Sequence, residues 1–85
     1  MFNWEQRANG DWVCEMPANI TLVAVPDRYK GGKPARGTKW RAACNHWNER
    51  TRTLSRYGRD EYMNPQNSAK AAMKLAEDIY NNRLT

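Results

Sequence analysis

The sequence predicts an α+β fold, with a four- to five-strand antiparallel sheet and one C-terminal helix packed on one face. Short segments in the first 57 residues alternate apolar and polar side chains, as strands do. Glycine, proline and asparagine residues separate these segments, as expected at turns. After residue 68 the apolar positions recur at helical spacing instead. A chain of 85 residues has the size of one domain, so we expect a single domain over residues 1–85.

The first two strands are predicted to turn at Asn9-Gly10. A two-residue turn would place Trp12 on the face opposite Trp4. A three-residue loop with Gly10 in the left-handed region shifts this register by one residue. The shifted register gathers the apolar side chains on one face, which then holds Phe2, Trp4, Gln6, Trp12, Cys14 and Met16. Because a one-residue slip turns every side chain to the other face, we predict the three-residue loop.

Three further strands are expected. The segment Ile20–Val25 is apolar on both sides, which predicts a central strand, and it stops at Pro26 because proline has no N–H for the ladder. A loop rich in glycine and basic residues follows over residues 27–38. The next strand, near residues 39–47, turns Trp40 inward. A hairpin around residues 48–50 then leads to a last strand over about residues 51–57.

An amphipathic helix is predicted to begin near Ala69. Its cap is either Asn64, followed by a proline, or Asn67. Small and apolar residues recur along one side of it, at Ala69, Ala72, Met73, Ala76, Ile79 and Tyr80. The alanines let the helix lie close to the sheet. We expect the core to be formed by Trp4, Trp12, Trp40 and Ile79.

The distribution of charge is the main indication of function. The segment Arg28–Arg59 holds one acid and a set of ten bases, namely Arg28, Lys30, Lys33, Arg36, Lys39, Arg41, Arg50, Arg52, Arg56 and Arg59. Its formal charge is +9, whereas the rest of the chain carries −4. Such a segment is expected to present a positive surface to a negatively charged partner.

The alternation of the strand near residues 39–47 places Arg41 and Trp47 on the outward face. Arg52 and Arg56 are predicted to join them from the neighbouring strand. Guanidinium groups bind phosphates and aromatic rings stack on bases, so this combination is typical of nucleic-acid binding. We therefore predict a binding surface made of the ten basic residues together with Trp47.

Other chemistries find little support in the sequence. The single histidine and the scattered acids indicate no catalytic group, and we predict a protein that is not an enzyme. Among Cys14, Cys44 and His46 only the last two are close in sequence, so we expect no metal and no cofactor. The two cysteines are predicted to be reduced and buried. No apolar run is long enough for a membrane span, and we expect a cytoplasmic protein that binds no membrane.

Several segments resemble known DNA-binding domains. They are Lys39-Trp40-Arg41-Ala42, Arg56-Tyr57-Gly58-Arg59, Tyr62 and the alanine-rich helix over residues 68–79. Together they resemble the sheet-plus-helix domains of plant ethylene-response factors and of tyrosine-recombinase N-terminal arms. The resemblance implies that the sheet enters the major groove of DNA, with Arg41, Arg52 and Arg56 as contacts.

In size and composition the chain also resembles the small proteins that phages encode to inhibit host machinery, CRISPR complexes among them. We therefore hold two functional hypotheses. The first is a non-enzymatic protein that binds nucleic acid, DNA or RNA, through its arginine-rich surface. The alternative is a phage-encoded inhibitor, anti-CRISPR-like or of another host-takeover kind, that binds an acidic surface of a host protein complex. A virion accessory that self-associates is a third possibility.

Overall fold

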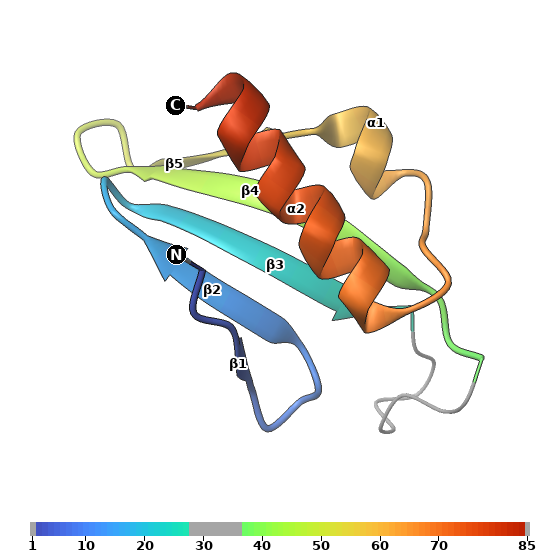
Figure 1. Cartoon of the computed structure of the whole chain (residues 1–85). Helices are drawn as coiled ribbons and strands as arrows, with labels where there is room; N and C mark the ends of the chain where they lie inside the picture. The colour runs from blue at the N-terminus through green and yellow to red at the C-terminus, as the bar shows by residue number, and fades with distance from the viewer. Residues whose placement is uncertain (1, 28–36, 85) are drawn as a thin grey trace.

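The computed structural model describes residues 2–27 and 37–84, which form a five-strand antiparallel sheet crossed by a helix (Figure 1). The strands lie side by side in chain order as β1 (Glu5–Gln6), β2 (Trp12–Met16), β3 (Ile20–Pro26), β4 (Trp40–Asn48) and β5 (Thr53–Tyr57). Two helices follow them, the one-turn α1 (Arg59–Tyr62) and the long α2 (Ala69–Arg83). Helix α2 packs against β3 and β4. The α+β class and the C-terminal helix are thus confirmed. We call the sheet face under α2 the inner face and the opposite one the outer face.

The β1–β2 hairpin has the predicted three-residue loop. Gln6 pairs with Trp12, and the Arg7 N–H donates to the Asp11 carbonyl oxygen at 2.8 Å. Gly10 closes the loop with a φ of 97°, a value that glycine adopts without strain. This register places Trp12 and its inward neighbours toward α2, so the gathering of apolar side chains decides the register as expected.

The bounds of the later strands differ from the prediction by one or two residues. β3 is the central strand, as predicted, and includes Pro26 as its last residue opposite Trp40. The proline is tolerated there because the Asp27 N–H makes the next bond, to the Lys39 carbonyl oxygen at 2.7 Å. β5 begins at Thr53, later than predicted, because Arg52 has a φ of 55° and belongs to the turn.

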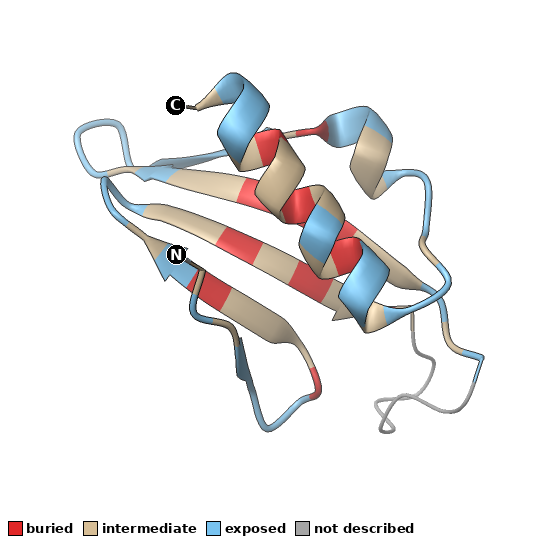
Figure 2. Ribbon diagram, in the orientation of Figure 1, coloured by how far each residue is buried: buried red, intermediate tan, exposed pale blue. Residues whose placement is uncertain are grey.

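The core contains Ile79, as predicted, but its other members are alanine, cysteine and leucine residues and not the predicted tryptophans. The core cluster lies between α2 and the sheet (Figure 2), and it consists of Cys14, Leu22, Ala24, Ala42, Cys44, Ala72, Ala76 and Ile79. Trp4, Trp12 and Trp40 are only partly buried and pack against this cluster. Alanines on both β4 and α2 bring helix and sheet close together, which leaves no space for an indole ring between them.

Helix α2 is capped by a residue that the sequence did not single out. The Ser68 hydroxyl accepts a hydrogen bond from the Ala71 N–H at 3.1 Å, so neither Asn64 nor Asn67 is the cap. Serine fills this role well because its short hydroxyl reaches the exposed N–H groups of the first turn. The predicted apolar stripe is confirmed, since Ala72, Ala76 and Ile79 are buried.

The sequence does not predict the short helix α1, which a glycine makes possible. Gly58 precedes α1 with a φ of 74°, and a Cβ at this position would lie 2.5 Å from Cδ1 of Ile79. Both its backbone conformation and its contact with α2 therefore require glycine. After α1 the chain returns to the edge of β4, where Trp40 and Gln66 exchange two backbone hydrogen bonds of 2.8 and 2.6 Å. Helix α1 is thereby held beside β4, beyond the end of β5.

Candidate nucleic-acid interface

The outer face of the sheet is not covered by α2, and the strand register decides which side chains it carries. Trp47 of β4 pairs with Leu54 of β5, and Asn45 pairs with Arg56. Because neighbours in register share a face, these four side chains form two adjacent rows on the outer face. The predicted orientation of β4, with Trp40 inward and Trp47 outward, is confirmed by the packing of Trp40 against the core.

Arg56 is the best-positioned basic residue of this face. Its guanidinium carbon lies 4.1 Å from the centroid of the Tyr62 ring, within the range of a cation–π contact. Its Nε donates a long hydrogen bond of 3.4 Å to Oδ1 of Asn45. The residue is nevertheless exposed to solvent. The ring therefore orients the guanidinium group without neutralising it, which leaves the charge available to an anion.

Arg41 contacts the same tyrosine, but it has a structural role. Its Nε donates to Asp27 Oδ1 at 2.8 Å, and its Nη1 donates to the Tyr62 carbonyl oxygen at 2.8 Å. The guanidinium carbon lies 5.7 Å from the Tyr62 ring, and only 25% of the side chain is exposed. Arg41 thus joins β4 to α1, and its charge is already paired with a carboxylate.

Trp47 and Leu54 form an apolar pair on the outer face. They are two of the three large hydrophobic residues that stand exposed among residues 2–27 and 37–84, with exposed fractions of 41% and 58%. They lie directly opposite each other on β4 and β5. An exposed tryptophan beside an exposed leucine is costly in water unless a partner covers them. This pair is therefore a candidate contact surface.

Two arginines stand at the tip of the β4–β5 hairpin. Asn48 shapes the turn, because its Oδ1 accepts hydrogen bonds from the N–H groups of Arg50 and Thr51 at 3.0 and 3.2 Å. Arg50 and Arg52 are exposed in this turn, together with Glu49. The tip extends the line of Arg56 and Trp47 beyond the end of the strands. We call this set the basic-aromatic surface, and it consists of Trp47, Arg50, Arg52, Leu54, Arg56 and Tyr62.

The remaining predicted site residues lie elsewhere. Arg59 is exposed at the start of α1. Lys39 lies at the other end of β4, where its Nζ donates to Oδ1 of Asn67. The four bases of the loop, Arg28, Lys30, Lys33 and Arg36, fall outside the described residues. Tyr62 and Asn45 were not predicted as site residues, because Tyr62 reaches the outer face only through α1.

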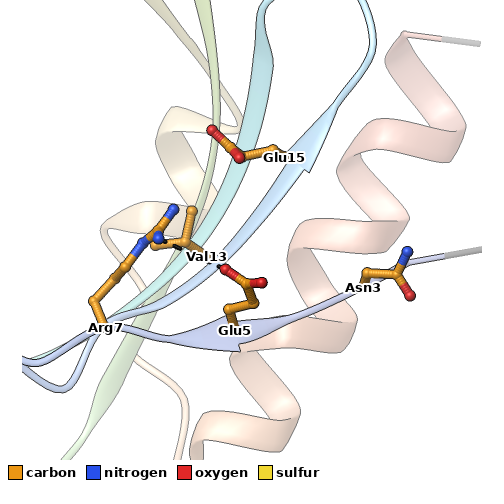
Figure 3. Close-up of a pocket in the computed structure, with 5 residues that line it drawn as sticks. All are labelled: Asn3, Glu5, Arg7, Val13 and Glu15. Carbon is orange, nitrogen blue, oxygen red and sulfur yellow. Dashed lines mark ion pairs between the residues drawn. The ribbon is translucent and has the colours of Figure 1, made fainter.

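The opposite edge of the outer face has the opposite charge. A hollow of about 160 Å³ is lined by Asn3, Glu5, Arg7, Val13 and Glu15, whose side chains are drawn in Figure 3. Arg7 approaches Glu5 at 3.6 Å, so one of the two glutamates already has a cationic neighbour. We call Glu5 and Glu15 the acidic edge. The outer face is therefore acidic along β1–β2 and basic along β4–β5.

The possible metal ligands and the two cysteines are the other groups that the sequence singled out. Among residues 2–27 and 37–84, no three His, Cys, Asp or Glu side chains lie together where they would hold a metal ion. Cys14 and Cys44 are free and fully buried, as the sequence predicts. Burial raises the pKa of the Cys44 thiol to about 11, and burial likewise raises the pKa of Cys14. Both are therefore poor nucleophiles at neutral pH.

Comparisons with protein-family models, with curated proteins and with solved structures find no match to this chain. The resemblance to ethylene-response factors and to recombinase arms therefore stays a prediction. In the part of the chain that the structure describes, neither helix has the length and apolar character of a membrane span. The charges and exposed side chains of the two halves of the outer face are therefore the basis for proposing a function.

Proposed function

We propose that this chain is a small, non-enzymatic protein that binds nucleic acid through the basic-aromatic surface. The observation that carries the proposal is the Arg56–Tyr62 contact of 4.1 Å beside the exposed Trp47–Leu54 pair. A guanidinium group held on a ring binds phosphate oxygens, and an exposed indole offers a face on which a base stacks. Neither group alone has this combination of charge and aromatic surface.

The composition of the neighbourhood supports the same partner. The exposed bases near Trp47 are arginines, whose planar, forked guanidinium binds phosphate in a bidentate manner. Arg50, Arg52 and Arg56 carry three positive charges, against the single acid Glu49 in the same hairpin. A locally positive surface attracts a polyanion even though the acidic edge lies on the same face.

A salt titration of binding tests this function. Fluorescence anisotropy with labelled DNA and RNA of single- and double-stranded form is expected to show binding at about 50 mM salt. Affinity is expected to fall steeply by about 200 mM, because each phosphate contact releases counterions. Lys70→Glu on the exposed side of α2 serves as a control and is expected to bind like the wild type. No binding to any of these probes at low salt would exclude the proposal.

The Trp47–Leu54 pair also favours a second function, that of an inhibitor which binds a host protein. Tryptophan and arginine are the residues that contribute most to protein interfaces, and here they are adjacent. A phage-encoded inhibitor of the anti-CRISPR or another host-takeover kind would use the same surface on an acidic host protein complex. Capture from host lysate after nuclease treatment separates the two functions, since only a protein partner survives that treatment.

A further inference from the structure

We infer that the nucleic acid bound is single-stranded, with an unstacked base on Trp47 and the backbone following β4 and β5 toward Arg56. This inference rests on the proposed function and adds to it the form of the ligand. Three features of the outer face carry it. They are its width and charge, the occupation of Arg41, and the order of side chains along β4.

The outer face is too wide and too unevenly charged for a duplex. Five strands at a spacing of about 4.8 Å span about 19 Å, whereas the DNA major groove is about 12 Å wide. A duplex that covered the whole face would bring phosphates toward Glu5 and Glu15 at the acidic edge. A single strand needs only the basic half of the face, so it avoids this repulsion.

Arg41 is not available for the groove contacts that the resemblance implies. Its guanidinium group already bonds Asp27 and the Tyr62 carbonyl oxygen, each at 2.8 Å. Arg52 lies in the hairpin turn and not on the strand. Of the three arginines that would read base pairs, only Arg56 both lies on a strand and is bonded to no carboxylate among the described residues.

The side chains along β4 instead suit a splayed single strand. Trp47 and Asn45 are alternate residues of β4, about 6.7 Å apart, and Asn45 lies directly opposite Arg56, which contacts Tyr62. Trp47 provides a stacking face, Asn45 carries an amide of the kind that bonds base edges, and Arg56 provides charge. Arg50 and Arg52 continue the positive charge at the other side of Trp47. This order matches the alternation of base and phosphate in an unpaired strand.

Binding of matched probes to the full chain tests the inference. The probes are oligo-dT, oligo-U and a mixed-sequence duplex, each of about 12 residues per strand. The single strands are expected to bind at least 10-fold more tightly than the duplex, and the two single strands together show whether DNA or RNA is preferred. Trp47→Ala is expected to weaken single-strand binding by about 5- to 150-fold, the effect of losing one stacked base. Met63→Ala, the matched control at an exposed apolar residue outside the basic-aromatic surface, is expected to change it by less than about 3-fold.

A second variant tests the role of the acidic edge independently of Trp47. Glu5→Gln with Glu15→Gln is expected to raise duplex affinity about 3- to 10-fold and to leave single-strand affinity unchanged. Thermal unfolding checks that each variant folds, which we expect because all these side chains face solvent. A duplex that binds as tightly as the single strands, or a Trp47→Ala variant with unchanged affinity, would overturn the inference and leave the proposed function standing. Failure of every probe to bind would remove both.

Discussion

The two halves of the outer face are both formed by antiparallel strands, but different segments follow at their edges. The β1–β2 half ends at a two-residue strand and carries Glu5 and Glu15 around an open hollow. The β4–β5 half continues into α1, which places Tyr62 beneath the guanidinium group of Arg56. An added helical turn thus distinguishes the half that we propose to bind a partner from the half that carries the acidic edge. The charges of the two halves by themselves do not show this difference.

Reversing the charge of the basic half should give the largest effect. Arg52→Glu with Arg56→Glu is expected to weaken nucleic-acid binding by about 100-fold, because phosphates then meet like charges. The control is Lys70→Glu with Lys74→Glu on α2, which changes the net charge equally. Lys74 pairs with Asp78 at 2.7 Å, but this pair is exposed and contributes little to stability. If both double variants lose the same affinity, net charge and not the basic half determines binding.

Substitution of Arg41 should lower the stability of the protein, whereas substitution of Arg56 should leave it nearly unchanged. Arg41→Met removes two hydrogen bonds that join β4 to α1, and it is expected to lower the free energy of unfolding by about 1–2 kcal/mol. Arg56→Met is expected to change stability by less than about 0.5 kcal/mol, because the side chain is exposed. Chemical denaturation measures both. A destabilised Arg56→Met or an unaffected Arg41→Met would contradict the division of roles between these arginines.

Substitution of each cysteine tests how the core contributes to stability beneath the two halves of the sheet, since Cys14 lies on β2 and Cys44 on β4. Cys14 and Cys44 both pair with Leu22, from β2 and from β4. Because burial raises the pKa of Cys44 from 9.0 to about 11, the stability that its neutral thiol provides is complete below about pH 9 and is lost as the pH rises toward 11. Between about pH 8 and pH 10 the wild type is expected to lose about 1–1.5 kcal/mol more stability than Cys44→Ala.

Cys14→Ala is the matched comparison for this pH dependence. Burial raises the pKa of Cys14 as well, but a backbone hydrogen bond from Asn3 acts in the other direction. The variant is therefore expected to remove less of the alkaline loss than Cys44→Ala does. Denaturation curves at several pH values give both differences. Equal slopes for the wild type and Cys44→Ala would show that this thiol does not ionise on unfolding in that range.

Local patterns predicted most of the fold. The alternation in β2 and β3 and the turn at Gly10 gave the correct register, and the spacing of Ala72, Ala76 and Ile79 gave the correct face of α2. The tryptophans were assigned wrongly to the centre of the core, because their size indicates burial but not how closely a helix approaches. That approach depends on pairs of alanines from distant segments, which no local pattern contains.

The candidate site was less predictable than the fold. The sequence places Trp47 and Arg56 on neighbouring strands, and the structure brings them onto one face. The sequence does not show that Arg41 is bonded to other residues, since its partners Asp27 and Tyr62 are 14 and 21 residues away. Arg52 was assigned to the strand because the alternation of apolar and polar residues does not show that its backbone has a positive φ and belongs to the turn. Contacts between distant segments, and not composition, separate a structural arginine from one that is free to bind.

Gly58 affects both faces of the sheet, because it packs against α2 on the inner face and begins the turn into α1 on the outer face. A Cβ at this position would meet Ile79 of α2, while the turn that the glycine permits places Tyr62 on the outer face. A bulkier residue at this junction would push on Ile79 and tilt the tyrosine away from its arginine. Among natural relatives we therefore expect Gly58 and Tyr62 to be kept or lost together, even though glycine has no side chain that could contact the tyrosine.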